Sequence, residues 1–96
     1  MGSSLMNVHT HAALRMIALD PGIRRSRLYA SEQDARRLDE LRARGFIVQE
    51  GEGYILTEAG KGLLRAFEGL SEALGVPEDV LNAEARLRAR YNRRVV

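Results

Sequence analysis

Residues 45–60, GFIVQEGEGYILTEAG, leave little freedom in how this part of the chain folds. They contain two runs rich in β-branched and aromatic residues, 46–49 and 54–56, separated by a glycine-containing turn, which is the pattern of a β-hairpin with a short loop. A two-stranded hairpin is marginally stable in water, so one side of it must pack on neighbouring helices. The predicted apolar anchors are Phe46, Val48, Tyr54 and Leu56.

A helix over residues 31–44 is predicted to lead into this hairpin. Ser31 fits its N-cap, and acidic side chains follow in the first turn, where exposed N–H groups favour them. Gly45 fits the left-handed position after the last helical residue, and Phe46 can fold back on Leu41, the contact of a Schellman stop. The buried stripe is Ala35, Leu38 and Leu41, and the outward face carries Gln33, Arg36, Arg37, Glu40 and Arg44.

The first helix is predicted over residues 8–19, with Asn7 as its cap. It ends at the Asp-Pro-Gly sequence of residues 20–22. Residues 23–30, IRRSRLYA, have few apolar anchors and three arginines, so they fit either a short helix or an extended connection. The apolar side of the first helix consists of Ala13, Leu14, Met16 and Ile17.

Two further helices are predicted after the hairpin. Thr57 caps the first of them, which ends at residues 75–77, and the second runs from Glu78 to about Arg90. Glycines inside the first helix each cost about 1 kcal/mol relative to alanine, so packing must sustain it. The apolar stripes are Ala59, Leu63, Phe67, Leu70 and Leu74 in the first helix, and Val80, Leu81, Leu87 and Tyr91 in the second.

The length of 96 residues supports one domain with a modest core, whose stability can depend on a partner subunit. The chain has no cysteine, which excludes disulfides, thiolate zinc sites and a cysteine nucleophile. No apolar run approaches a membrane span, and no charged-then-apolar leader opens the chain, so we expect a soluble, cytoplasmic protein without a membrane partner. Residues 1–6 are expected to be a disordered N-terminus or a cloning remnant.

All but one of the 15 basic residues are arginine, and most of the basic residues gather in two segments, 23–44 and 80–96. The forked guanidinium group is suited to phosphate, which favours a polyanionic partner. The alternative is that the arginine excess reflects a GC-rich genome.

The sequence offers little support for catalysis. His9 and His11 stand two positions apart, hence on different faces of a helix, and are expected to be surface residues. The Gly-Lys-Gly sequence of residues 60–62 lacks the context of a nucleotide-binding loop. We therefore expect no catalytic residue, metal or cofactor, and a chain that is not an enzyme.

Two stretches, LDELRARGFI and YILTEAGKGLL, carry a resemblance to a known family. From about Leu14 to Phe67 the chain resembles the winged helix-turn-helix of MarR-like and PadR-like transcriptional regulators. The resemblance implies a mainly α (α+β) fold with a short two-stranded wing and two C-terminal helices. Residues 7–75 would form the winged-helix domain, and residues 76–96 a dimerisation helix with a basic tail.

In this family the helix that matches residues 31–44 enters the major groove of DNA, led by its N-terminal residues. The alternative is that Arg36 and Arg37 only solvate a packed helix, pairing with Glu32 and Glu40. Only about eleven residues separate the first helix from Ser31, so the family's usual helix before the turn is shortened or replaced here. The DNA-binding residues implied are Arg24, Arg25, Arg27, Ser31, Gln33, Arg36, Arg37 and Arg44.

The hairpin tip, residues 50–53, carries Glu50 and Glu52, whereas a wing that grips DNA normally offers arginine or lysine. We therefore expect the hairpin to be structural, with the acids keeping it out of the groove or facing a basic surface on a partner. The resemblance also places a dimer contact on the C-terminal helices, with Leu70, Leu74, Leu81, Leu87 and Tyr91 as candidates.

The expected function is that of a sequence-specific regulator, a repressor, which binds double-stranded DNA as a homodimer. The rival interpretation is a winged-helix module that binds another protein, in a nucleoprotein assembly or as a viral inhibitor. The acidic tip and the shortened motif helix favour the rival, and the arginine segments favour DNA.

Overall fold

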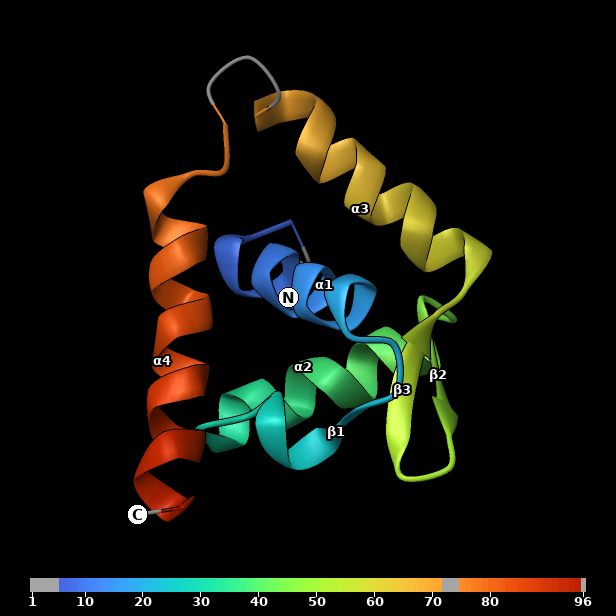
Figure 1. Ribbon diagram of the computed structural model, residues 1–96. Coiled ribbons are helices and arrows are strands. Elements are labelled where there is room, and N and C mark those ends of the chain that lie inside the picture. The colour runs from blue at the N-terminus through green and yellow to red at the C-terminus, as the bar shows by residue number, and fades with distance from the viewer. Residues whose placement is uncertain (1–5, 72–74, 96) are drawn as a thin grey trace.

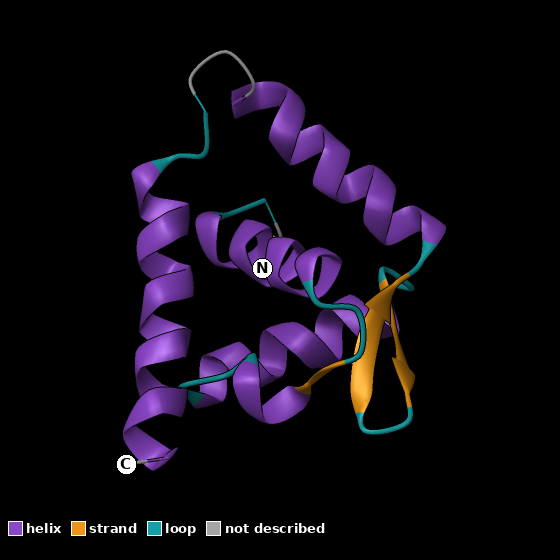
Figure 2. Cartoon of the chain, in the orientation of Figure 1, coloured by secondary structure: helices purple, strands orange, loops and turns teal. Residues whose placement is uncertain are grey.

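The computed structural model of the 96-residue chain describes residues 6–71 and 75–95, but not the side chains of residues 70–71 and 90–95. Over these residues the chain is mainly helical with a small antiparallel sheet, an α+β fold (Figures 1 and 2). In none of the described segments is a helix both long and apolar enough to cross a bilayer. In chain order the elements are α1 (Val8–Leu19), β1 (Ile23–Arg24), the 3-10 helix η1 (Arg25–Arg27), α2 (Glu32–Ala43), β2 (Ile47–Glu50), β3 (Gly53–Leu56), α3 (Glu58–Ser71) and α4 (Glu78–Val95).

Helix α1 lies at the centre of the molecule, with α4, α3 and α2 around it (Figure 1). Its bounds and its cap are confirmed: the Asn7 side chain accepts the Thr10 N–H at 3.0 Å. Leu14 and Ile17 are fully buried, and the core also takes in Leu28, Leu38, Leu41, Ile47 and Tyr54. The apolar side expected for this helix therefore faces the core.

Residues 23–30 contain a short strand and a 3-10 turn, which settles the open choice between a helix and an extended connection. β1 pairs antiparallel with β3, so that the sheet has the order β1-β3-β2. Ile23 is buried at the sheet, opposite Tyr54 in register. The connection is thus an integral part of the core.

The hairpin is confirmed, but one of its predicted anchors is wrong. Val48 is 43% exposed, whereas its neighbour Ile47 is 2% exposed and belongs to the core. Because side chains alternate along a strand, the register that pairs Ile47 with Leu56 and Val48 with Ile55 turns the second pair outward. Tyr54 is buried as predicted, and Phe46 and Leu56 are half-buried.

The stop of α2 is a Schellman motif, as the sequence predicts. The Phe46 N–H donates to the Leu41 carbonyl at 2.9 Å, the Gly45 N–H donates to the Arg42 carbonyl at 3.1 Å, and Gly45 has a φ of +82°. Thr57 then joins this stop to α3, because its hydroxyl donates to the Gly45 carbonyl and accepts the Gly60 N–H. The end of α2 and the start of α3 are therefore held together by local hydrogen bonds.

Helices α3 and α4 cover α1 with apolar faces that differ in part from the predicted stripes. On α3, Leu64 and Phe67 are buried, Leu63 is half-buried and Ala59 is exposed. α4 extends beyond the predicted end, to Val95. It buries Val80, Ala83 and Leu87 against its own chain.

Candidate functional site

The outward face of α2 carries three of the predicted site residues. Gln33 is exposed, and Arg36 is 74% exposed with its guanidinium 3.3 Å from Glu32 one turn earlier. Arg44, just past the helix, lies 3.6 Å from Glu40. Exposed pairs of this kind contribute little free energy, so these arginines can exchange a carboxylate for another anion.

Arg37 does not lie on this face, which corrects the prediction for it. Its side chain is 17% exposed and donates to Asp34 Oδ1 at 2.8 Å, at i,i+3 spacing. The side of α2 that holds Asp34 is turned toward α4, because the Arg86 guanidinium forms two hydrogen bonds of 2.9 Å with that carboxylate. Arg37 is therefore part of an internal network.

Asp34 is the centre of that network and is 4% exposed. Ser31 forms a capping box with it: the Asp34 N–H donates to the Ser31 hydroxyl oxygen, and Asp34 Oδ2 accepts the Ser31 N–H at 3.1 Å. The same oxygen accepts the Ala30 N–H at 2.9 Å. Burial alone would raise the pKa of Asp34, but the hydrogen bonds from Arg86, Ala30 and Arg37 outweigh burial and hold the pKa well below its usual range.

The arginines of the connection before α2 have different roles. Arg25 donates to Asp39 at 3.1 Å and to the Tyr54 hydroxyl at 3.0 Å, and it lies over the Tyr29 ring, so it ties the connection to α2 and to β3. Arg24 is 71% exposed, and Arg27 is also exposed. Arg24 is thus accessible beside the hairpin, on β1 next to β3, and Arg27 is accessible on η1.

The acidic hairpin tip faces one of these arginines. Glu52 lies 3.4 Å from Arg24, and both side chains are more than two-thirds exposed. Glu52 thus pairs with a cation of its own chain, Arg24 on β1. Glu50 is exposed at the end of β2.

Sequence reasoning missed the long-range ion pairs that fix α4. Glu84 is 1% exposed and accepts a hydrogen bond from Arg15 Nε at 2.7 Å, which joins α4 to α1, and Arg88 lies 3.4 Å from Glu84.

The Ser-x-x-Asp spacing of residues 31–34 is a sequence signal of the capping box. No sequence pattern, however, connects Asp34 to Arg86, because 52 residues separate them.

Of the predicted dimer residues, Leu81 and Leu87 have side chains that the structure describes. The side chains of Leu70 and Tyr91, and the whole of Leu74, lie outside the described residues. Leu81 is 45% exposed. Leu87 is 5% exposed within the core of its own chain, so it is not available to a second subunit while α4 stays docked.

His11 is a buried residue, and the expectation that it lies on the surface is wrong. It is 3% exposed, its ring stacks on Phe67 with a centroid distance of 4.9 Å, and its Nε2 has no hydrogen-bond partner. His9 is exposed as expected. Among the described residues, no group of three or more His, Cys, Asp or Glu side chains could hold a metal ion.

Burial lowers the pKa of His11, nearby Arg15 lowers it further, and Glu68 and Glu84 act in the opposite direction. Below its ordinary value of 6.5 the unfolded chain therefore binds more protons at His11 than the folded chain. We expect the free energy of unfolding to fall as the pH drops below about 6.5, and a His11→Leu variant to show a shallower fall. Urea unfolding at a series of pH values measures this slope.

His9→Leu is the matched variant, because the pKa of His9 is also lowered, by burial and by Arg37 and Arg86, so that His9 has its own share of the slope. His9→Leu should keep the part of the slope that His11 causes. A His11→Leu variant with the same pH dependence as the wild type would show that His11 titrates alike in both states.

Comparison with protein-family models, with curated proteins and with solved structures found no match.

Proposed function

We propose that the chain is a winged helix-turn-helix protein that binds double-stranded DNA and represses transcription as a homodimer. The observation that carries this proposal is the position of α2: its rear packs on the core, its outward face presents Gln33 and Arg36, and its C-terminal end leads into the β2–β3 hairpin. Arginine can bind guanine O6 and N7, and glutamine can bind adenine N6 and N7. The order of helices and strands is compatible with that of the resembling regulators, except that the 3-10 helix η1 stands where the family has a helix before the turn.

The exposed arginines around α2 would supply most of the affinity. Arg24, Arg27 and Arg44 are exposed near the two ends of the helix or beside the hairpin, where they can neutralise phosphates. In this proposal Arg37 and Ser31 do not contact DNA, because both are hydrogen-bonded to Asp34. They would position the first turn of α2, and Arg25 would position the connection before it.

The dimer contact would use the outer face of α4. The inner face is occupied by its own core, whereas Leu81 is exposed on the outer side. A two-fold pair places two copies of α2 about one DNA turn apart and matches a palindromic site.

Titration of fluorescently labelled duplex DNA at several salt concentrations tests the proposal. We expect wild-type affinity to fall with salt on a log–log plot, and Arg36→Ala to weaken binding about tenfold and to make the slope shallower by about one unit. Arg24→Ala together with Arg36→Ala should remove about two units. Two chains per duplex are expected at saturation.

Arg65→Ala is the matched control, because Arg65 is an exposed arginine on α3, away from α2. Its salt slope should equal that of the wild type. If no duplex is bound even at low salt, the DNA proposal fails.

The second candidate function is a winged-helix module that binds another protein. It is favoured by one observation: the exposed arginines Arg24, Arg36 and Arg44 all lie close to carboxylates of their own chain. Such a compensated surface attracts a polyanion less than an uncompensated one does. The same titration separates the two candidates, since a protein module would show no salt-dependent DNA binding.

A further inference from the structure

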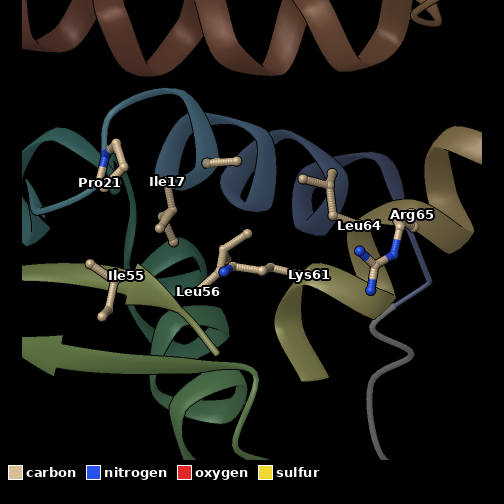
Figure 3. Close-up of a pocket in the computed structure, with 8 residues that line it drawn as sticks. Ile17, Pro21, Ile55, Leu56, Lys61, Leu64 and Arg65 are labelled. Atoms are coloured by element: carbon tan, nitrogen blue, oxygen red, sulfur yellow. The ribbon is translucent and has the colours of Figure 1, made fainter. Parts of the chain in front are cut away.

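A groove of about 490 Å³ lies between the end of α1, strand β3 and helix α3 (Figure 3). Most of its lining is apolar, but in Figure 3 two cationic side chains of α3 lie among the apolar ones. Among the residues that line it are Ile17, Pro21, Ile55, Lys61, Leu64 and Arg65. None of the residues that line the groove comes from α2, so it is a different surface from the proposed DNA face.

The groove has cations and no carboxylate of its own. Arg65 is exposed, and no described residue forms an ion pair with it. Lys61 lies 3.1 Å from Glu58, but the two side chains are 55% and 88% exposed, so this pair is weak and exchangeable. A ligand that carries carboxylates would therefore gain two counterions beside an apolar surface.

Two exposed apolar side chains adjoin residues that line the groove. Leu19, which precedes the groove residue Pro21 by two positions, is 71% exposed. Val48 is 43% exposed and is the cross-strand partner of Ile55, which lines the groove. Exposed apolar side chains next to a groove are typical of an interaction site, and a small molecule in the groove would leave Leu19 and Val48 uncovered.

We propose that this groove, together with Leu19 and Val48, docks an acidic amphipathic segment of a partner protein. The apolar side chains of the segment lie against Ile17, Ile55 and Leu64, and its carboxylates pair with Lys61 and Arg65. The inference goes beyond the proposed function and does not depend on it. A chain that binds DNA through α2 could hold such a partner at the same time.

Selection from a library of random linear peptides on the immobilised wild-type protein tests this inference. We expect the enriched sequences to combine Asp or Glu with large apolar residues. One enriched peptide, labelled and measured by fluorescence anisotropy, should bind Lys61→Glu/Arg65→Glu about tenfold more weakly than the wild type. Leu19→Ser, a change at an exposed position, should also weaken binding. Circular dichroism verifies that each variant keeps the fold.

Arg42→Glu is the matched control, because Arg42 is an exposed arginine on α2 that no described residue pairs with. The peptide should bind this variant as it binds the wild type. The inference fails if no acidic apolar sequence is enriched, or if the enriched peptide binds Lys61→Glu/Arg65→Glu as well as the wild type. It also fails if decanoate binds in the groove while peptides do not. Finally, it fails if the wild-type protein associates with itself and Arg65→Glu abolishes this association, because the occupant is then a second copy of the chain.

Discussion

Replacement of Gly60 by alanine is expected to lower the free energy of unfolding by about 3 kcal/mol, although alanine is the better helix former. A Cβ at this position would lie 1.9 Å from the Phe46 carbonyl oxygen and 2.9 Å from its carbon. These atoms belong to the backbone, and the oxygen accepts the Thr57 N–H at 3.1 Å, so relief requires α3 to move away from the hairpin. Urea unfolding followed by circular dichroism measures the loss.

Gly62, two residues later in the same helix, provides the control. A Cβ there meets nothing within 4 Å, so Gly62→Ala should stabilise the protein by about 1 kcal/mol. The pair of variants therefore separates helix propensity from close packing. Equal effects of the two substitutions would mean that α3 does not approach Phe46 as closely as the structure has it.

Features that depend on neighbours in the sequence could be predicted. The Ser31 cap, the Gly45 stop and the hairpin each need only a few consecutive residues, because their hydrogen bonds close over short distances along the chain. Gly60 shows the limit of this approach. From the sequence it is only a weak helix residue, whereas its role depends on Phe46, which another element brings against it.

The candidate site likewise has features that the sequence predicts and features that it does not. The exposure of Arg36 follows from helical periodicity, since it lies opposite the buried Leu38 and Leu41. The burial of His11 and the internal role of Arg37 depend on where α3 and α4 pack, which periodicity along one helix does not specify. The Val48 anchor failed for a related reason: a short strand with apolar residues at consecutive positions gives no clear register.

The second large effect is expected for Asp34→Ala, which should lower the free energy of unfolding by about 2–3 kcal/mol. The change removes the Asp34 half of the capping box and the bidentate contact with Arg86. It also leaves the guanidinium of Arg37, whose side chain is only 17% exposed, without its carboxylate partner. The loss stays below that of a fully buried pair because the Arg86 side chain is 40% exposed and can be solvated. Asp39→Ala, at a 63% exposed carboxylate paired with Arg25, should cost less than about 1 kcal/mol.

Acid unfolding should also depend on the contact of Asp34 with Arg86 and Arg37. The folded pKa of Asp34 lies below its ordinary value of 3.8, so its stabilising contribution is complete well above that pH and is lost as the pH falls through and below it. Asp34→Ala should lack this part of the acid sensitivity. A variant that keeps the wild-type acid profile would show that Arg86 and Arg37 do not stabilise the charged carboxylate.

If the proposed function holds, Asp34→Ala should also change DNA binding, and in the direction opposite to stability. Without the carboxylate, Arg37 and Arg86 carry uncompensated charge beside the first turn of α2, which attracts phosphate. The salt slope for non-specific duplex DNA should therefore become steeper by about one unit, although the fold is weaker. General unfolding would weaken binding instead, and an unchanged slope would mean that the network supports the fold without setting the charge that DNA encounters.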